Sequence, residues 1–463
     1  MAPVYVGLTD KAFLRLHHGY GAPVISQTVT IMANRLTDDQ LSEMYATLRS
    51  GPFMRRVHRP RVPFARWRWV LADTALPLSL EHAAIDDADA LAWANDQAQY
   101  PLDPERGYGW RLSAVPTRSG GMVCSCVASH AIADGHAGLM AAIGLVQPEL
   151  ATTEGLDDVI DVRADLKDGL RRGATVAREA VSEARRAAKD PSHRAALRKA
   201  LSRRGAAHAE PTPLGWREGS VIATFDAAQW KDIAAQRGGT PNTLYLALVA
   251  DLLRHCGLVG EADPLVLMTA VRILREQDQI DSNSFARVPI VVQREWLDRL
   301  DLAPLRAASK AGFGSVHAVG SGGISRPRNM PPELIDVLPE GVVERLVDTP
   351  PITVGMCSNM GVLDPFLPTV MRQGAQPTMF VMRGVFQGID TARAAAQPIA
   401  LATWLSEFDG KIQWVLESIK PEMAHTDDEL GFLARLVAET WGLKPLQIST
   451  GGGITSKTAR EFS

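Results

Sequence analysis

A basic, alanine-rich segment divides the chain and limits how it can fold. Residues 163–204 contain 13 Lys or Arg against 5 Asp or Glu. Apolar side chains recur there at helical i, i+3/i+4 steps until Asp190-Pro191, a pair that breaks a helix. This change of composition predicts an N-terminal lobe at 1–155, a basic helical connector at 156–215 and a C-terminal lobe at 216–463.

The apolar positions of the connector admit two interpretations. They are Leu166, Leu170, Ala174, Ala177, Val181, Ala184 and Ala188. In the first interpretation they belong to a basic amphipathic helix that rests on an anionic membrane or lipid droplet, or docks an acidic carrier protein. In the second, the stripe packs on the body of the protein and the charges are solvated. Because alanine buries little area, we favour the second interpretation.

Bulk composition excludes several classes of function. The 463 residues are 46% hydrophobic and 22% charged, which is enough apolar material for at least two cores. A net charge of -3 gives no field that gathers nucleic acid. The four cysteines lack disulfide or zinc spacing, and we find no signal peptide and no apolar run of the roughly 20 residues a membrane span needs. We therefore expect a cytoplasmic protein, with at most peripheral membrane contact.

Both lobes are predicted to be mixed α/β (α+β mixed sheets) with helices on the sheets. In the first lobe, strands are expected at 27–32, 67–72 and 122–129 and helices at 37–48, 87–97 and 135–146. In the second lobe, strands are expected at 220–226, 265–271, 288–293, 352–359 and 411–418, and helices at 227–236, 240–255 and 427–441.

The stretch H-A-I-A-D-G, which follows the 122–129 strand, is the main candidate for chemistry. In one interpretation His130 is a general base, available as a neutral imidazole at pH 7. In a second, His130, Asp134 and His136 are half of a metal site, although a helix would put His136 on the opposite face. In the third, Asp134 caps the following helix and His130 is a satisfied core residue. For an isolated motif the third interpretation is favoured.

Two other stretches are expected to be plain connections. His17 and His18 are adjacent, so they cannot both face one metal from a regular element, and we expect a turn there. The glycine-rich stretch 319–328 lacks the lysine of a phosphate-binding loop and is expected to be a surface loop.

The motif and its surroundings resemble a known family. H-A-I-A-D-G after an apolar strand resembles the H-x-x-x-D-G signature of the thioester-dependent acyltransferase and condensation-domain superfamily, and in particular the bacterial wax ester synthase/diacylglycerol acyltransferase family. L-T-D-K-A-F-L-R-L (8–16) and P-L-D-P-E-R-G-Y-G-W-R-L (101–112) are similar to segments of its first lobe, with Gly107 where proline is usual. The family carries two adjacent histidines, and Ser129 stands where the first is usual.

The second lobe continues the resemblance in the same order. One segment resembles the family's helix that begins with Asn-Asp: it reads P-N-T-L-Y-L-A-L-V-A-D-L-L-R, with Thr243 in place of the aspartate. A-V-R-I-L with Asn283 and V-P-I-V-V, then C-S-N-M-G, then E-F-D-G-K-I-Q-W are similar to later segments. The resemblance covers roughly residues 4–440.

The resemblance implies a fold and a reaction. The fold would be two chloramphenicol-acetyltransferase-like lobes around a central channel. The reaction would move an acyl group from acyl-CoA or an acyl carrier protein directly to an alcohol or amine, and His130 would be the general base that removes the proton of the acceptor. The acyl thioester would be a co-substrate, and no other cofactor or metal would be needed. Asp134, paired with Arg272, and Gly135 would support the loop. Further channel candidates are Ser129, Ser358 and Asn359.

Two alternatives stay open. Cys357 or Ser358 could form an acyl-enzyme with His130 as its base, although the context lacks the nucleophile-elbow pattern. Ser129 in place of histidine also leaves open a catalytically silent binding or scaffold protein that kept the fold in a lipid or natural-product pathway.

Overall fold

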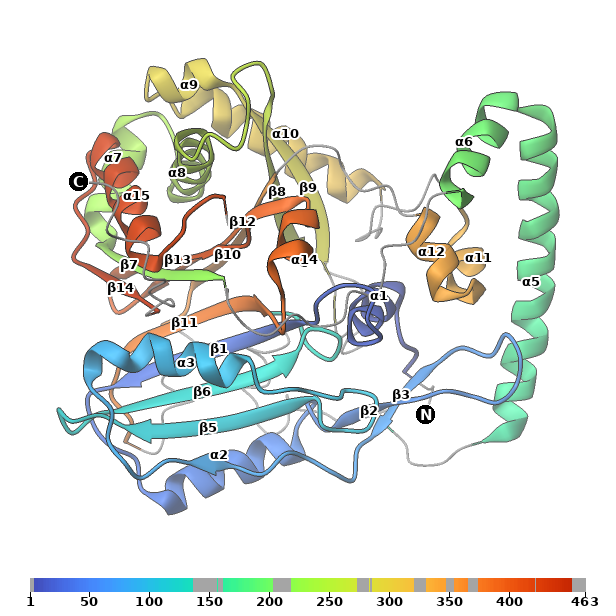
Figure 1. The fold of residues 1–463 in the computed structure, drawn as a ribbon, viewed down its shortest axis with the longest axis horizontal. Helices are drawn as coiled ribbons and strands as arrows, with labels where there is room; N and C mark the ends of the chain where they lie inside the picture. Colours follow the sequence, from blue (N-terminus) through green and yellow to red (C-terminus); the bar gives the residue numbers. More distant parts are fainter. Residues whose placement is uncertain are drawn as a thin grey trace.

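The computed structural model consists of two lobes and a set of helices beside them (Figure 1). It describes residues 4–135, 156, 161–202, 218–272, 283, 285–319, 330–346, 354–364, 374–420 and 422–451. Each lobe is built around one sheet with helices on it, which confirms the predicted class of mixed α/β lobes. The boundaries predicted at residues 155 and 215 fall outside the described residues and stay predictions.

The first lobe has a five-stranded sheet in the order β11-β1-β6-β5-β4. Its strands are β1 (Val24–Met32), β4 (Ser79–Leu80), β5 (Trp110–Pro116), β6 (Met122–Ser129) and β11 (Pro377–Phe386). β11 pairs antiparallel with β1, from Val24 opposite Phe386 to Met32 opposite Pro377. A strand from the C-terminal half of the chain thus completes the sheet of the first lobe, and the two halves are interlocked.

Different helices cover the two faces of this sheet. Side chains alternate along β1, so Val29 and Thr28 point to opposite faces. α3 (Ala90–Ala98), preceded by the short 3-10 helix η1 (Asp87–Asp89), buries Leu91 on the Val29 side. α2 (Asp38–Ser50) lies on the Thr28 side, and Thr37 and Gln40 cap it reciprocally. α1 (Leu8–His17) and the ribbon of β2 (Arg55–His58) and β3 (Arg68–Leu71) lie at one end of the lobe.

The second lobe has a seven-stranded sheet in the order β14-β7-β13-β12-β10-β8-β9. Its strands are β7 (Gly219–Asp226), β8 (Leu265–Arg272), β9 (Phe285–Val292), β10 (Val354–Val362), β12 (Ile399–Phe408), β13 (Lys411–Ser418) and β14 (Gln447–Thr450). β10 runs parallel to both β8 and β12, whereas the other pairings are antiparallel. The sheet is therefore mixed, as expected.

One helix forms the centre of the second lobe. α8 (Pro241–His255) begins at Thr240, whose hydroxyl accepts from the backbone N–H of Thr243, and its side chains from Thr243 to Leu253 are all buried. A helix that is buried all round belongs to the middle of a core. Around it lie α7 (Ala227–Gln236), α9 (Arg294–Asp298), α10 (Ala303–Val319) and α15 (Asp427–Thr440). α14 (Thr391–Ala396) belongs to a separate apolar cluster, in which Ala394 packs with Ala402 and Ile419.

Four helices beside the two lobes form what we call the helical arm. They are α5 (Val162–Lys189), α6 (Pro191–Leu201), α11 (Pro332–Val337) and α12 (Glu340–Leu346). α5 is the long green helix at the edge of the molecule in Figure 1; α6 and α11 pack on it, and α12 packs on α6. None of the helices among the described residues is long and apolar enough to cross a membrane.

The arm corrects one prediction. The apolar stripe of α5 was expected to pack on the body, but Leu170 is 68% exposed, Leu166 52% and Val181 50%. The buried positions of α5 are instead Asp165, Gly169, Val176 and Glu183. The expectation was wrong because the neighbours of α5 carry charged side chains. These form ion pairs with acidic residues on the polar side of the helix, so that side is buried.

A buried charge cluster joins the two lobes. Arg383 lies on β11 in the first sheet, and its Nη1 donates to Glu417 Oε1 on β13 at 2.7 Å and to Ser220 Oγ on β7 at 2.5 Å. On the first-lobe side, its Nε donates to Gln27 Oε1 at 2.9 Å and its Nη2 to Asn95 Oδ1 at 2.5 Å. One guanidinium thus holds strands from both sheets.

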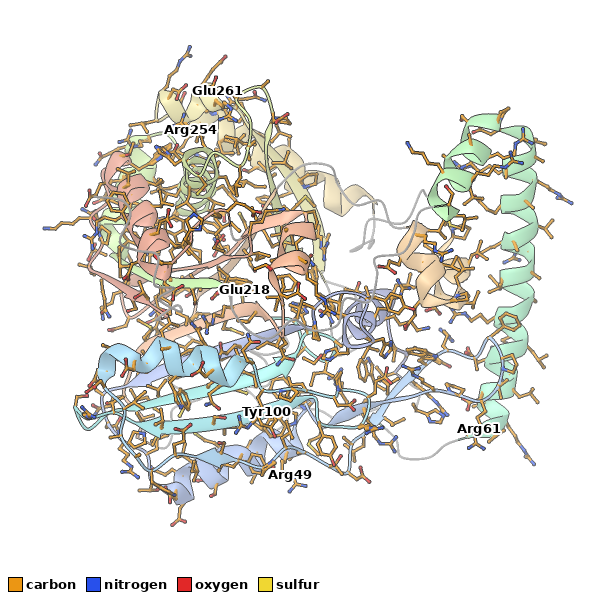
Figure 2. All side chains as sticks on the ribbon, viewed as in Figure 1. Arg49, Arg61, Tyr100, Glu218, Arg254 and Glu261 are labelled. Atoms are coloured by element: carbon orange, nitrogen blue, oxygen red, sulfur yellow. The ribbon has the colours of Figure 1, made fainter. Side chains whose placement is uncertain are left out.

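A second carboxyl shares this cluster. Glu218 lies between the two sheets (Figure 2) and accepts a hydrogen bond from the backbone N–H of Phe386 at 3.2 Å. Burial, and then the nearby Glu417, raise the pKa of Glu218 well above its usual value. Burial also raises the pKa of Glu417 to about 7, although Arg383 opposes the change. The single arginine is therefore the charge that makes two buried carboxyls tolerable.

Replacing Arg383 should lower the stability of the folded protein. We expect Arg383→Met to lower the free energy of unfolding by about 3–5 kcal/mol, because it leaves the buried carboxyl of Glu417 and three further buried acceptors without their donor. The measurement is urea denaturation near neutral pH. The matched control is Arg118→Met, which breaks an exposed ion pair with Asp86 and should cost at most about 1 kcal/mol. Equal losses of stability in the two variants would contradict the role of Arg383 in holding the two sheets together.

Candidate active site

His130 lies where the two lobes meet. It follows directly after β6, and its backbone N–H donates to the carbonyl of Val24 at 3.0 Å, which fixes the start of the motif against β1. The imidazole stacks on Phe13 of α1, with ring centroids 4.1 Å apart, and meets Phe285 of β9 edge-on at 6.2 Å. Its ring is therefore held from both lobes.

Asn283 fixes the tautomer of this ring. Its amide nitrogen Nδ2 donates to Asp10 Oδ1 and to the carbonyl of His130, both at 2.8 Å. Its Oδ1 must then face Nδ1 of His130, at 2.9 Å, and can only accept, so Nδ1 carries the hydrogen. Nε2 of His130 is left with its lone pair, which is the arrangement that a base requires.

Asp10 supports this amide in turn. Its Oδ2 accepts from the backbone N–H of Gly7 at 3.0 Å and from Trp69 Nε1 at 3.2 Å. Burial raises the pKa of Asp10 to about 6, although these hydrogen bonds oppose the rise. Asp10 and Asn283 both lie in segments that resemble the acyltransferase family, but neither was assigned a role from sequence, since only the fold brings them together.

The environment of His130 keeps it neutral. Burial lowers the pKa of His130 below its usual 6.5, while Asp134 and the hydrogen bond from the ring to Asn283 partly oppose this change. The imidazole is consequently unprotonated at neutral pH and can accept a proton.

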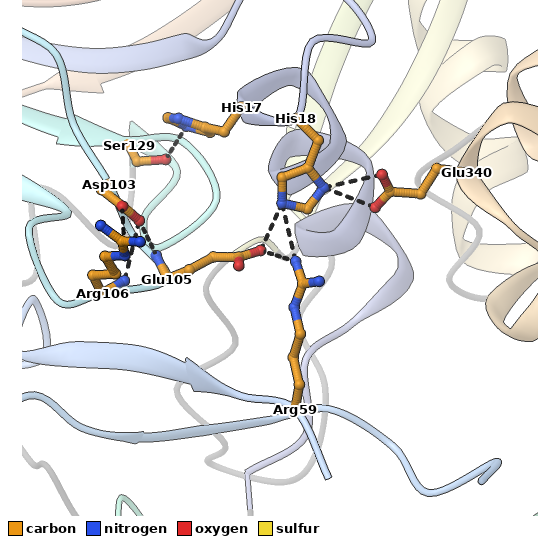
Figure 3. A network of polar contacts seen from close by, with 8 residues as sticks. All are labelled: His17, His18, Arg59, Asp103, Glu105, Arg106, Ser129 and Glu340. Atoms are coloured by element: carbon orange, nitrogen blue, oxygen red, sulfur yellow. Dashed lines mark hydrogen bonds and ion pairs between the residues drawn. The ribbon is translucent and has the colours of Figure 1, made fainter. Parts of the chain in front are cut away.

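Ser129 is hydrogen-bonded to a histidine of another element. Its side chain is fully buried, and its Oγ lies 2.9 Å from Nε2 of His17, the last residue of α1 (Figure 3). Burial lowers the pKa of His17 to about 4, so this ring is neutral. An imidazole thus lies beside the start of the motif even though the sequence carries serine there. His17 and Ser129 are 112 positions apart, so the sequence around either residue did not indicate this contact.

His18 points to a different set of partners. Its Nδ1 lies 2.8 Å from Glu340 Oε1 of α12, and its Nε2 lies 2.7 Å from Glu105 Oε1, which Arg59 also contacts (Figure 3). The hydrogen bond to Glu105 raises the pKa of His18, and Glu340 adds to the rise, while burial opposes it. The turn expected at these two residues begins only at His18, because His17 is the last residue of α1 and His18 is its C-terminal cap. The expectation of a plain connection was wrong, since both rings contact residues that are distant in the sequence.

The rest of the motif is buried and lies close to the second lobe. Asp134 is buried, and Gly135 is the last residue described before positions 136–155; the helix expected at 135–146 and His136 therefore lie outside the described residues. A Cβ on Gly135 would lie only 3.0 Å from Met360 Cε of β10, so glycine allows the second lobe to approach this closely. Arg272 lies on β8, but its side chain is not among those described, and its pairing with Asp134 stays a prediction.

The other second-lobe candidates lie on β10. Asn359 is exposed; it donates to Asn242 Oδ1 at 2.9 Å and accepts from the N–H of Gly361 at 2.9 Å. The Ser358 hydroxyl lies 3.8 Å from Met360 Sδ. Their role in a channel stays a prediction.

Cys357 is poorly suited to covalent chemistry. Its side chain is fully buried in the core of the second lobe, and burial raises the pKa of its thiol to about 12. A thiolate is the reactive form of cysteine, so this residue has almost none at neutral pH.

An apolar pocket lies on the first sheet beside the motif. Small side chains of β1 and β6 form its floor and α2 forms a wall, while Ala133 of the motif loop closes one end. Ser26 Oγ donates to the carbonyl of Ala133 at 3.2 Å, which ties the floor to the loop. The lining residues are Ser26, Thr28, Thr30, Met44, Leu48, Phe53, Leu112, Cys124, Cys126, Ala128, Ala133, Phe380 and Met382.

Comparison with known proteins finds similarity in structure alone. No family model and no curated protein sequence matches the chain. Among solved structures, it is similar to the first condensation domain of the CDA synthetase, with a TM-score of 0.56 and 15% identity over 96% of this chain and 98% of that one.

Two further structures are similar over nearly their whole length. The wax ester synthase/diacylglycerol acyltransferase from Marinobacter aquaeolei VT8 has a TM-score of 0.53 and 15% identity, covering 94% of this chain and 98% of that one. Polyketide synthase associated protein 5 from Mycobacterium tuberculosis has a TM-score of 0.53 and 13% identity, covering 95% and 99%. The chain therefore has the two-lobed fold that condensation domains and wax ester synthase/diacylglycerol acyltransferase share.

Proposed function

We propose that the protein is an acyltransferase that moves an acyl group from a thioester to a hydroxyl or amine, with His130 as general base. The observation that carries the proposal is the neutral His130 ring at the lobe junction, with Nδ1 occupied by Asn283 and Nε2 free to accept a proton. The fold agrees with this assignment, since its solved neighbours include a wax ester synthase/diacylglycerol acyltransferase.

The reaction needs one base and no covalent acyl-enzyme. Nε2 of His130 removes the proton of the acceptor as its oxygen or nitrogen attacks the thioester carbonyl carbon. The C–S bond then breaks, and the same proton passes from Nε2 to the leaving thiolate. The acyl thioester is a co-substrate, and this mechanism asks for no other cofactor.

The residues around His130 serve the base by orientation. Asn283, held by Asp10, keeps the hydrogen on Nδ1, so that Nε2 does not have to lose a proton before it can gain one. His17 and Ser129 hold the backbone at the start of the motif, because Ser129 Oγ also accepts from the N–H of Ala131 at 3.3 Å. Asp134, Gly135 and Arg272 complete this support in our proposal.

The apolar pocket suits the acyl chain of the donor. It starts at Ala133, three residues after the proposed base, and most of its lining side chains are apolar, while Ser26, Thr28 and Thr30 add hydroxyls. A condensation domain with the same fold was solved in complex with C8-CoA and Leu-SNAC, both of them thioesters. We propose acyl-CoA or an acyl carrier protein as donor and an alcohol or amine as acceptor.

A silent binding protein is the second candidate, since Ser129 departs from the paired histidines. The His17 contact weakens that alternative, because it places an imidazole beside Ser129.

Removing the base should remove turnover. We expect His130→Ala to lower kcat by about 10²- to 10⁴-fold, the usual contribution of general base catalysis. The measurement is thiol release from a panel of acyl-CoAs with alcohol and amine acceptors. The control is His82→Ala, which changes an exposed loop histidine. Unchanged turnover in His130→Ala would refute the base, and acyl-protein trapped at Ser358 would favour the covalent route.

The amide of Asn283 should control the pH profile. Its hydrogen bond raises the pKa of His130, so Asn283→Ala should move the acidic limb of the kcat profile to lower pH. Losing one hydrogen bond should also lower kcat by about 2- to 13-fold. Asn34→Ala, whose side chain bonds an exposed loop, is the control. A residue with only a structural role would lower folded yield and leave the limb in place.

Filling the pocket should shorten the preferred acyl chain. We expect Ala128→Phe to lower kcat/KM for long-chain donors by at least about tenfold relative to short-chain donors, since each buried methylene is worth about 0.8 kcal/mol. Ala128→Gly is the matched control. An unchanged chain-length profile would place the acyl chain elsewhere, without bearing on His130.

A further inference from the structure

The helix α5 presents its apolar stripe to solvent. Val162, Leu166, Leu170 and Val181 are 64%, 52%, 68% and 50% exposed, and all four fall on one side of a 28-residue helix. The alanines at 174, 177, 184 and 188 continue the same side and are also exposed. A surface helix normally turns its apolar side inward, so this orientation needs a cause.

The polar side of α5 faces its neighbours instead. Asp165 pairs with Arg68 at 3.0 Å and Asp168 with Arg66 at 2.6 Å, both at the β2–β3 ribbon. Further along the helix, charged groups meet the other helices of the arm: Arg172 contacts Asp336 of α11, Glu183 contacts His193 of α6, and Glu179 lies near Glu333. These contacts fix the rotation of α5, so its apolar side is held outward.

The exposed charges of α5 are all basic. Its four acidic residues, at 165, 168, 179 and 183, face the body or the arm. The exposed charged side chains are Arg163, Lys167, Arg171, Arg178, Arg185, Arg186 and Lys189. Given 100° of rotation per residue, most of these lie along one border of the apolar stripe. The outward surface therefore combines apolar and positive groups.

A loop adds an aromatic side chain to this surface. Phe64, between β2 and β3, has a φ of 64°, which is unusual for a bulky residue, and its side chain is 49% exposed. The loop fits because α5 has glycine where it passes: a Cβ on Gly169 would lie 2.7 Å from the carbonyl of Pro63, and Gly173 lies against the Phe64 ring. Arg61, on the same loop, lies near the base of α5 (Figure 2).

We propose that the outward side of α5, together with Phe64, docks the protein on an anionic lipid surface. The apolar stripe would enter the interface and the basic border would contact the headgroups, as in helices that lie in the plane of a membrane. The helix is about 42 Å long and extends along the edge of the molecule, so its whole length can meet a flat surface (Figure 1). This proposal is independent of the proposed acyl transfer.

The charge pattern favours a lipid surface over the other occupants. A second copy of the chain would bring its own basic border against the first, which is repulsive. An acidic protein would neutralise the basic border of α5. It would not by itself explain an apolar stripe exposed over the length of the helix, whereas a lipid surface explains both. The experiment below distinguishes all three.

The test is sedimentation of the purified full chain with vesicles of phosphatidylcholine, with and without phosphatidylglycerol. We expect binding to the anionic vesicles that weakens as salt is raised. Leu166→Glu/Leu170→Glu should reduce this binding at least about tenfold, and Lys167→Glu/Arg178→Glu at least about 25-fold, since each basic residue near an anionic surface contributes about fivefold.

Matched controls use exposed positions on other helices. Phe432→Glu/Leu436→Glu on α15 and Arg306→Glu/Arg435→Glu, on α10 and α15, carry the same changes away from the arm and should bind as the wild type does. Circular dichroism verifies that all four variants are folded. Equal binding to both kinds of vesicle, or equal losses in controls and α5 variants, would overturn the proposal.

Two further measurements identify the alternatives. Light scattering that shows a dimer broken by Leu166→Glu/Leu170→Glu, with no vesicle binding, would assign the surface to a second copy. Binding of a purified acidic carrier protein that the α5 variants abolish, again without vesicle binding, would assign it to a protein partner. Either result would overturn docking on lipid.

Discussion

The buried guanidinium of Arg383 is the interaction on which the two-lobed arrangement depends. It belongs to a strand that the C-terminal half of the chain lends to the first sheet, and it bonds a carboxyl and a hydroxyl of the second. The same guanidinium opposes the rise that burial causes in the pKa of Glu218 and Glu417, the two carboxyls buried between the sheets. The junction so formed is where His130 meets residues of both lobes, so the geometry of the candidate site follows from how the lobes are held together.

Local patterns in the sequence predicted much of the fold. The strand at 122–129, the helix at 227–236 and the strand at 411–418 agree with the structure to the residue, because each combines a clear apolar period with a turn or cap at its ends. Pairing between distant strands left no such trace. Nothing in residues 377–386 indicates that they join β1 more than 340 positions away, which is decided by tertiary packing.

The candidate site was predictable in its centre and not in its surroundings. His130, Asp134 and Gly135 follow one another in the chain, so a motif could identify them. Asn283 and His17 reach the motif from a second lobe and from α1, and a single sequence does not show that such residues are neighbours. The outward rotation of α5 was missed for a related reason, since an amphipathic period does not say which side the rest of the protein will cover.

The short helix α1 contacts both the surroundings of the candidate base and the helical arm. Asp10 and Phe13 hold the Asn283 amide and the His130 ring, and His17 reaches Ser129. The same helix is fastened to the arm by Lys11, 2.5 Å from Asp336, and by His18, its C-terminal cap, which bonds Glu340. α1 therefore links the helical arm directly to the residues that orient the His130 imidazole, so a substitution in α11 or α12 that displaces α1 is expected to change the geometry of the candidate base.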